Sequence, residues 1–112
     1  VFGCGGDRDR GKRPEMGGIA ESLSDRVLVT DDNPRTEDPE RIVREILEGM
    51  KRPSQAQGIH DRAAAIRTAL TTAGAGDLVL VAGKGHETTQ VVGDQVLGFD
   101  DCQITRETLW NL

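Results

Sequence analysis

Apolar residues along the chain form three short, unbroken runs. Val27–Thr30 and Asp77–Ala82 are rich in β-branched and aliphatic side chains without alternation, which is typical of strands covered on both faces by helices. Val1–Phe2 has the same character and predicts the end of a third strand. Each run is followed by a polar loop, so three strand ends of the predicted sheet carry charged side chains.

Other apolar residues recur every three or four positions, which is the spacing of an amphipathic helix. This pattern predicts four helices. The first three span about Pro14–Ser24, Asp38–Gly49 and Asp61–Ala73, and the last begins at Asp100 or Asp101. An aspartate opens each of the last three, where its side chain can accept hydrogen bonds from the free N–H groups of the first turn.

The remaining pattern predicts a β-hairpin and one very short edge strand. Gln90–Val92 and Gln95–Phe99 flank a Gly-Asp pair, a two-residue turn that favours an antiparallel hairpin. Ile59 fits the very short edge strand. Strands that alternate with helices predict the fold class α/β, with a Rossmann-like, mostly parallel sheet flanked by helices and a C-terminal antiparallel hairpin. Residues 1–112 have the length of a single domain.

In sheets of this kind, ligands bind beyond the carboxyl ends of the strands, where the three polar loops are expected to meet. These loops carry both signs of charge, whereas a phosphate site concentrates cations and N–H groups. The mixture favours a ligand with both ammonium and carboxylate groups. The polar residues expected at this edge are Arg8, Arg10, Lys12, Arg13, Asp31, Asp32, Asn33, Arg35, Lys84, His86 and Glu87.

The loop after the second strand suits such a ligand best. Pro34 lacks an N–H and biases Asn33 away from helical geometry, so the loop is expected to be extended. Asp32 can accept from an ammonium group, and Arg35 can bind a carboxylate through two parallel hydrogen bonds. Taken singly, these residues also fit plain roles at a strand end or on the surface. His86 is interpreted as a hydrogen-bonding loop residue, because no nucleophile or metal partner accompanies it.

Two glycine-rich motifs offer weaker alternatives. The segment 6–12 has the spacing of a phosphate-binding P-loop, but Arg13 stands where the magnesium-binding hydroxyl belongs, and the two aspartates of the segment would repel phosphate. The segment 3–6 hints at a dinucleotide-binding turn, yet Arg8 occupies the position of the last glycine. Neither motif therefore predicts a nucleotide site.

Charge, hydropathy and cysteine content exclude several classes. A net charge of -5 disfavours a nucleic-acid partner, and no apolar run is long enough to span a membrane or resembles a secretory leader. Cys4 and Cys102 lack metal-ligand spacing and are expected to be free thiols of a cytoplasmic protein. Val1 is not an initiator residue, so we expect a fragment whose first strand begins upstream.

Three motifs together resemble the C-terminal domain of the Mur ligase family over essentially the whole chain. The motifs are Gly3-Cys4-Gly5-Gly6-Asp7-Arg8-Asp9 with Gly11-Lys12-Arg13-Pro14, then Asp32-Asn33-Pro34-Arg35, then Val81-Ala82-Gly83-Lys84-Gly85-His86-Glu87. The resemblance is to members that add meso-diaminopimelate to UDP-N-acetylmuramoyl-L-alanyl-D-glutamate. It implies that meso-diaminopimelate is bound by Arg8, Asp32, Asn33, Pro34, Arg35, Gly83 and Glu87.

The same resemblance implies an ATP-dependent, amide-forming ligase of peptidoglycan precursor synthesis. In that family, ATP turns the D-glutamyl carboxylate into an acyl phosphate, the amine of diaminopimelate attacks it, and ADP and phosphate leave. ATP, Mg²⁺ and the UDP-substrate belong to domains that this chain lacks, so the chain alone is expected to hold no cofactor or metal and to be inactive. Its expected part is to position the amine, without a catalytic residue of its own.

A stand-alone amino-acid-binding or regulatory module is the alternative. An upstream Gly-Lys-Thr or Gly-Lys-Ser P-loop would decide for the ligase.

Overall fold

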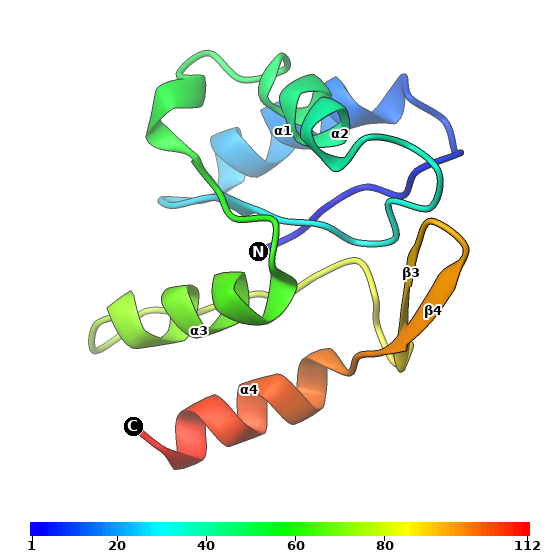
Figure 1. Cartoon of the computed structure of the whole chain (residues 1–112). Coiled ribbons are helices and arrows are strands. Elements are labelled where there is room, and N and C mark those ends of the chain that lie inside the picture. Colours follow the sequence, from blue (N-terminus) through cyan, green and yellow to red (C-terminus); the bar gives the residue numbers. More distant parts are fainter.

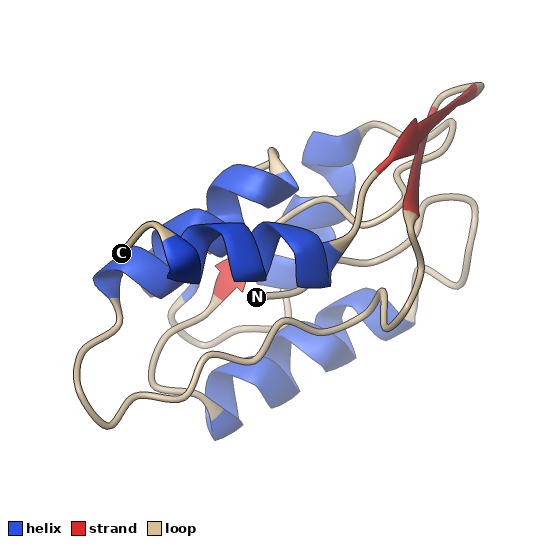
Figure 2. Ribbon diagram, turned by 90° about the horizontal axis from the view of Figure 1, so that it is seen from below, coloured by secondary structure: helices blue, strands red, loops and turns tan.

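The computed structural model describes residues 1–112 and shows helices on both sides of a set of extended segments (Figure 1). Helices α1 and α2 lie on one side and α3 and α4 on the other, while a hairpin of β3 and β4 lies at one end (Figure 2). The elements in order are α1 (Lys12–Leu23), β1 (Leu28–Val29), α2 (Pro39–Leu47), the 3₁₀ turn η1 (Pro53–Gln55), β2 (Gln57–Gly58), α3 (Arg62–Thr72), β3 (Thr89–Val92), β4 (Gln95–Gly98) and α4 (Asp101–Trp110).

The extended segments run parallel around Val1–Phe2. Strand β1 pairs in parallel with β2 on one side. On its other side, Phe2 N donates to Leu28 O at 3.1 Å and Thr30 N donates to Phe2 O at 2.9 Å. Ala82 N donates to Val1 O at 2.9 Å, which adds the segment 80–82 to the arrangement. With the antiparallel β3–β4 pair, this confirms the predicted α/β fold class.

The core lies between the parallel segments and the pair α1–α2. These two helices pack closely because glycines face backbone: a Cβ on Gly17 would lie 2.0 Å from Ile46 O, and one on Gly49 would lie 1.7 Å from Pro14 O. None of the helices combines the length and hydropathy needed to cross a bilayer. The buried residues of the core cluster are Phe2, Cys4, Val29, Ile42, Val43, Ile46 and Met50.

The locally encoded elements are confirmed. The side chains of Asp38, Asp61 and Asp100 each accept a hydrogen bond from a backbone N–H in the first turn of the helix that follows. The hairpin forms with its two-residue turn where the Gly-Asp pair predicts it.

Both cysteines are free, with Cys4 buried and Cys102 exposed.

Several elements differ from the predictions, most clearly in three places. Helix α1 begins at Lys12 rather than Pro14, because the proline fits anywhere in a first turn where N–H groups have no partner. The short strand β2 precedes Ile59, which still donates from its N–H to Val29 O at 2.9 Å. The run Asp77–Ala82 is extended but forms no regular strand, since its pairing is limited to the two hydrogen bonds with Val1.

Extension of the chain upstream of Val1 is expected to raise the melting temperature. Leu78 and Leu80 are 93% and 71% exposed on the segment beside Val1, and added residues in line with Val1 would pair with this segment and cover apolar surface. Thermal unfolding of the two lengths, followed by circular dichroism, measures the effect. An extension of the same composition in scrambled order is the control, and equal melting temperatures for all three chains would contradict the expectation.

Candidate functional site

Three loops meet at the carboxyl ends of the parallel segments, as the sequence predicts. The first loop follows Val1–Phe2 and joins the second through Gly6 N, which donates to Asn33 O at 2.8 Å. The third loop follows the segment 80–82 and reaches the second through Lys84, whose Nζ donates to Asn33 Oδ1 at 2.9 Å. The three loops therefore form one continuous polar edge.

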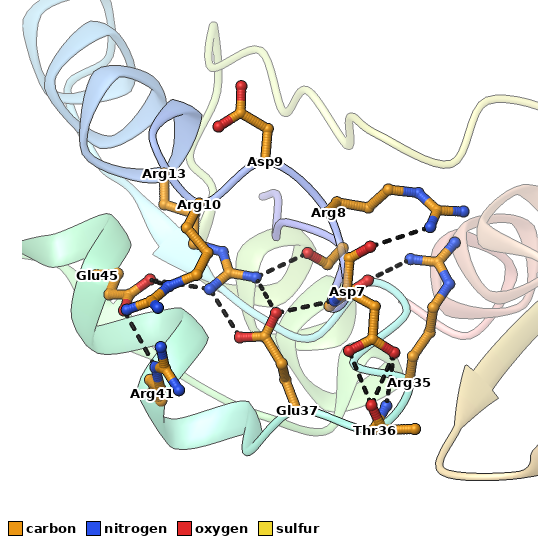
Figure 3. A network of polar contacts seen from close by, with 12 residues as sticks. Asp7, Arg8, Asp9, Arg10, Arg13, Arg35, Thr36, Glu37, Arg41 and Glu45 are labelled. Atoms are coloured by element: carbon orange, nitrogen blue, oxygen red, sulfur yellow. Dashed lines mark hydrogen bonds and ion pairs between the residues drawn. The ribbon is translucent and has the colours of Figure 1, made fainter.

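A buried arginine connects the first loop to α2 (Figure 3). The Arg13 side chain is 0% exposed and donates to both carboxylate oxygens of Glu37 at 2.8 and 2.9 Å, to Glu45 Oε1 at 2.9 Å and to Gly5 O at 3.0 Å. Arg10 also pairs with Glu45. The expectation that Arg10 and Arg13 face the ligand edge is wrong, because the glutamates near α2 take up both guanidinium groups.

These contacts make the fold sensitive to acid. Hydrogen bonds from Arg13 lower the pKa of Glu37 to about 2, and hydrogen bonds from Arg10 lower the pKa of Glu45 to about 2, from an ordinary value of 4.5. Between pH 4.5 and 2 the unfolded chain binds more protons at these groups than the folded chain does. Their stabilisation is therefore present above pH 4.5 and is lost as the pH falls toward 2.

Replacement of Glu37 with glutamine is expected to make stability less dependent on pH in this window. The variant lacks one of the two carboxylates that titrate differently in the folded and unfolded chains. Urea unfolding at a series of pH values from 7 to 2 measures the slope, and Glu40→Gln on the exposed first turn of α2 is the matched control. An unchanged slope in Glu37→Gln would show that this ion pair does not set the acid response.

Two residues of the site have strained backbone. Asp7 and Arg35 have φ angles of 56° and 52°, a left-handed region that non-glycine residues seldom adopt. Asp7 is held because its carboxylate accepts from Thr36 Oγ1 at 2.8 Å and its N–H donates to Glu37 Oε1 at 2.8 Å. Arg35 is bridged to β3, where its N–H donates to Val91 O at 3.0 Å. The surrounding loops thus fix both conformations.

Arg8 and Arg35 lie side by side over Gly5 (Figure 3). A Cβ on Gly5 would lie 2.8 Å from Arg35 Nη1 and 3.4 Å from Arg8 Cγ, so both side chains pass close to this glycine. Arg35 Nη1 donates to Gly6 O at 2.9 Å, and Arg8 Nη1 donates to Asp7 O at 3.1 Å. Neither guanidinium has a carboxylate partner, whereas the other arginines labelled in Figure 3 pair with glutamates.

The acidic part of the site comes from the second loop. Asp32 is partly buried, and its Oδ1 lies 3.0 Å from Lys84 Nζ. Gly83 lies close by, since a Cβ there would be 3.7 Å from Asp32 Oδ2. Pro34, in the same loop, is fully buried. The structure therefore brings Asp32, Asn33 and Gly83 to the same edge as the two free arginines.

The other polar residues expected at this edge lie elsewhere or make no contact. Asp31 accepts at 2.8 Å from His60, and burial raises the pKa of the Asp31 carboxyl against the opposing effect of this partner. His86 and Glu87 are exposed on the third loop, and neither side chain bonds to the protein. Lys12 is exposed in the first turn of α1. The ligand role of Glu87 therefore stays a prediction.

Sequence reasoning missed the contribution of the hairpin. Gln90 in β3 donates from Nε2 to Asp32 O at 2.8 Å and to Asp31 O at 3.3 Å. Val91 N donates to Asn33 Oδ1 at 2.9 Å. The only signal in the sequence was a glutamine within an otherwise apolar hairpin strand, and this pattern does not identify its hydrogen-bond partner.

The segment 6–12 does not fit a nucleotide phosphate. Gly6 N and Asp7 N, which would face phosphate in a P-loop, donate instead to Asn33 O and Glu37 Oε1. No group of three or more His, Cys, Asp or Glu side chains is placed to hold a metal ion. The first two N–H groups of the segment are therefore not free to bind a phosphate.

We expect this chain alone to show no tight ATP binding. Isothermal titration calorimetry with millimolar ATP, with and without Mg²⁺, is the measurement. Tight binding that disappears in Lys12→Ala but persists in Lys51→Ala would show that the segment 6–12 is a phosphate site after all.

Fold and site together define an α/β domain in which two arginines without a carboxylate partner and one partly buried aspartate lie at the same edge of the parallel segments. The profile described as "Mur ligase, glutamate ligase domain" matches residues 1–85, and the chain belongs to this family. UDP-N-acetylmuramoyl-L-alanyl-D-glutamate--2,6-diaminopimelate ligases of Trichormus variabilis and Coxiella burnetii are 57% and 52% identical to it over 109 residues. A solved structure of a ligase of the same name has 46% identity and a TM-score of 0.93 over 99% of the chain.

The chain covers only part of these relatives. The matches take in 97% of this chain but 22% of the length of the two ligases, and 23% of the solved chain. The resemblance to the Mur ligase C-terminal domain is thereby confirmed, while the activity of the longer proteins remains a matter for proposal.

Proposed function

We propose that this chain is the amino-acid-binding domain of a cytoplasmic ligase that adds meso-diaminopimelate to UDP-N-acetylmuramoyl-L-alanyl-D-glutamate. The observation that carries the proposal is the pair Arg8 and Arg35, which lie side by side without a carboxylate partner, close to the loop that presents Asp32. The names of the similar ligases support the choice of substrate.

The charges of diaminopimelate match those of the site. The amino acid carries two carboxylates and two ammonium groups. The carboxylates bind cationic side chains, and the ammonium groups bind anionic ones. Arg8 and Arg35 bind carboxylate. Asp32, Asn33, Glu87 and the backbone of Gly83 bind the remaining polar groups, while Pro34 keeps the loop extended.

The rest of the reaction belongs to other parts of the longer protein, which bind ATP, Mg²⁺ and the UDP-substrate. Those parts activate the D-glutamyl carboxylate with ATP. This domain supplies the position of the attacking amine, and placing a nucleophile beside an activated carbonyl contributes several kcal/mol, up to about 7–11 kcal/mol in the best-oriented systems.

The proposal is tested on the longer protein that contains this chain. ADP release and amide formation are measured with meso-diaminopimelate, L-lysine and L-ornithine as alternative amino acids, each with UDP-N-acetylmuramoyl-L-alanyl-D-glutamate and ATP. Ligation with meso-diaminopimelate at the highest kcat/KM supports the proposal. Ligation of a different amino acid overturns the substrate, and amino-acid binding without ligation favours the stand-alone module.

A further inference from the structure

Lys84 is a deeply buried cation at the ligand edge. Its side chain is 0% exposed, and Nζ donates to Asn33 Oδ1 and to Thr89 O, both at 2.9 Å. The third neighbour is Asp32 Oδ1 at 3.0 Å, in an ion pair that falls short of hydrogen-bond geometry. A buried ammonium is costly unless it is fully paired. Its contacts therefore hold the side chains of Asn33 and Asp32 in place.

The contacts of Asn33 determine which way its amide faces. Oδ1 accepts from Lys84 Nζ and from Val91 N, each at 2.9 Å. An ammonium and a backbone N–H can only donate, so the amide oxygen must point at them. The Nδ2 group then faces away from both and is not used by any hydrogen bond within the chain. Asn33 can therefore only donate to a ligand.

The same lysine determines which oxygen Asp32 presents. Oδ1 is buried against Lys84, whereas Oδ2 lies on the side of Gly83. Lys84 thus gives the side chains of Asn33 and Asp32 different roles. Asn33 presents a donor, which fits a carboxylate oxygen, and Asp32 presents an acceptor, which fits an ammonium group.

We propose that Lys84 is a positioning residue for amino-acid recognition, which orients Asn33 as a hydrogen-bond donor and Asp32 as an acceptor without touching the ligand. The inference rests on the proposed function, because it supposes that the ligand is an amino acid. Lys84 determines which polar groups of Asn33 and Asp32 face the ligand. The backbone of β3, at Thr89 O and Val91 N, holds the same arrangement.

The first test compares Lys84→Met with the wild type in the longer protein. The methionine fills similar volume but cannot donate, so the Asn33 oxygen keeps only the hydrogen bond from Val91 N and the amide is held less firmly. We expect KM for the amino acid to rise at least about tenfold, with KM for ATP and for the UDP-substrate within about twofold of wild type. Lys51→Met, at an exposed loop position, is the matched control and should leave all three KM values unchanged.

A double-mutant cycle separates positioning from general stability. Because Lys84 acts through Asn33 and Asp32, Lys84→Met should raise the amino-acid KM by a clearly smaller factor in an Asn33→Ala background than in the wild type, and the remaining rise is the part that passes through Asp32. Full additivity of the two changes would overturn the proposal, and so would an equal loss for all three substrates. Asn33→Asp keeps an oxygen for Lys84 but has no NH₂ group, and it should raise KM for the amino acid as Asn33→Ala does.

A wrong role for Lys84 and a wrong proposed function give different experimental results. The wild-type amino-acid panel identifies the substrate first, and the KM split is then measured with whichever amino acid the wild type uses. If wild type uses an amino acid other than diaminopimelate, the proposed substrate is wrong while the role of Lys84 is still decided by the split. If wild type uses diaminopimelate and no split is found, the role of Lys84 is wrong while the proposed function stands.

Discussion

Replacement of Arg35 with alanine in the longer protein should lower kcat/KM for meso-diaminopimelate by about one to two orders of magnitude. The guanidinium is free of carboxylate partners, and a charge-assisted hydrogen bond of about 1.5–3 kcal/mol to the ligand would be lost. ATP and the UDP-substrate bind to other parts of the protein in our proposal, so their KM values should be nearly unchanged. Steady-state kinetics with each substrate varied in turn measures both effects.

Two further variants sharpen this test. Arg35→Lys should also fail, because a point charge cannot reproduce two parallel hydrogen bonds. Arg44→Ala, at an exposed position of α2, removes an arginine outside the site and should have no effect. Near-normal kinetics of Arg35→Ala with diaminopimelate would mean that this loop is not the specificity element, and Arg8 would become the better candidate. If Arg35→Ala lowers the melting temperature as well as the activity, then Arg35 acts by holding the strained turn and not by binding the ligand.

The features that the sequence predicted well depend on neighbours in the chain. An aspartate before a helix caps N–H groups only two or three residues away, as Asp61 and Asp100 do. A Gly-Asp turn between two apolar runs specifies a hairpin from within. The convergence of the three loops also followed from local information, because parallel strands place their carboxyl ends at one edge.

The features that the sequence could not predict depend on the choice of distant partners. Arg8 and Arg13 are close in the sequence, yet Arg13 turns inward, because α2 brings Glu45 to it across 32 positions. Lys84 was expected at the ligand edge, but the sequence could not predict that it contacts Asn33, 51 positions away. Asp77–Ala82 has strand-like composition, but a strand also requires a neighbour along its length, and here it lies beside Val1 alone.

One distant ion pair is expected to contribute strongly to stability. Arg62 is 1% exposed at the start of α3, and its guanidinium donates from Nε and Nη2 to the two carboxylate oxygens of Asp101 in α4, both at 2.7 Å. It also donates to Ala82 O at 3.2 Å and to Asp31 O at 3.4 Å. The side chain thus connects both helices on this side of the molecule to two of the strand ends.

Replacement of Arg62 with methionine should therefore cost about 3–5 kcal/mol of unfolding free energy, because it leaves the Asp101 carboxylate buried without a partner. That is a large share of the roughly 5–15 kcal/mol that holds a domain folded. Urea unfolding at neutral pH measures the loss, and Arg67→Met on the exposed face of α3 is the matched control. The double variant Arg62→Met with Asp101→Leu removes both charges and should recover much of the loss. If Arg62→Met alone costs less than about 1 kcal/mol, which is the range of an exposed ion pair, then the two helices are held together by their apolar contacts, and the buried pair contributes little.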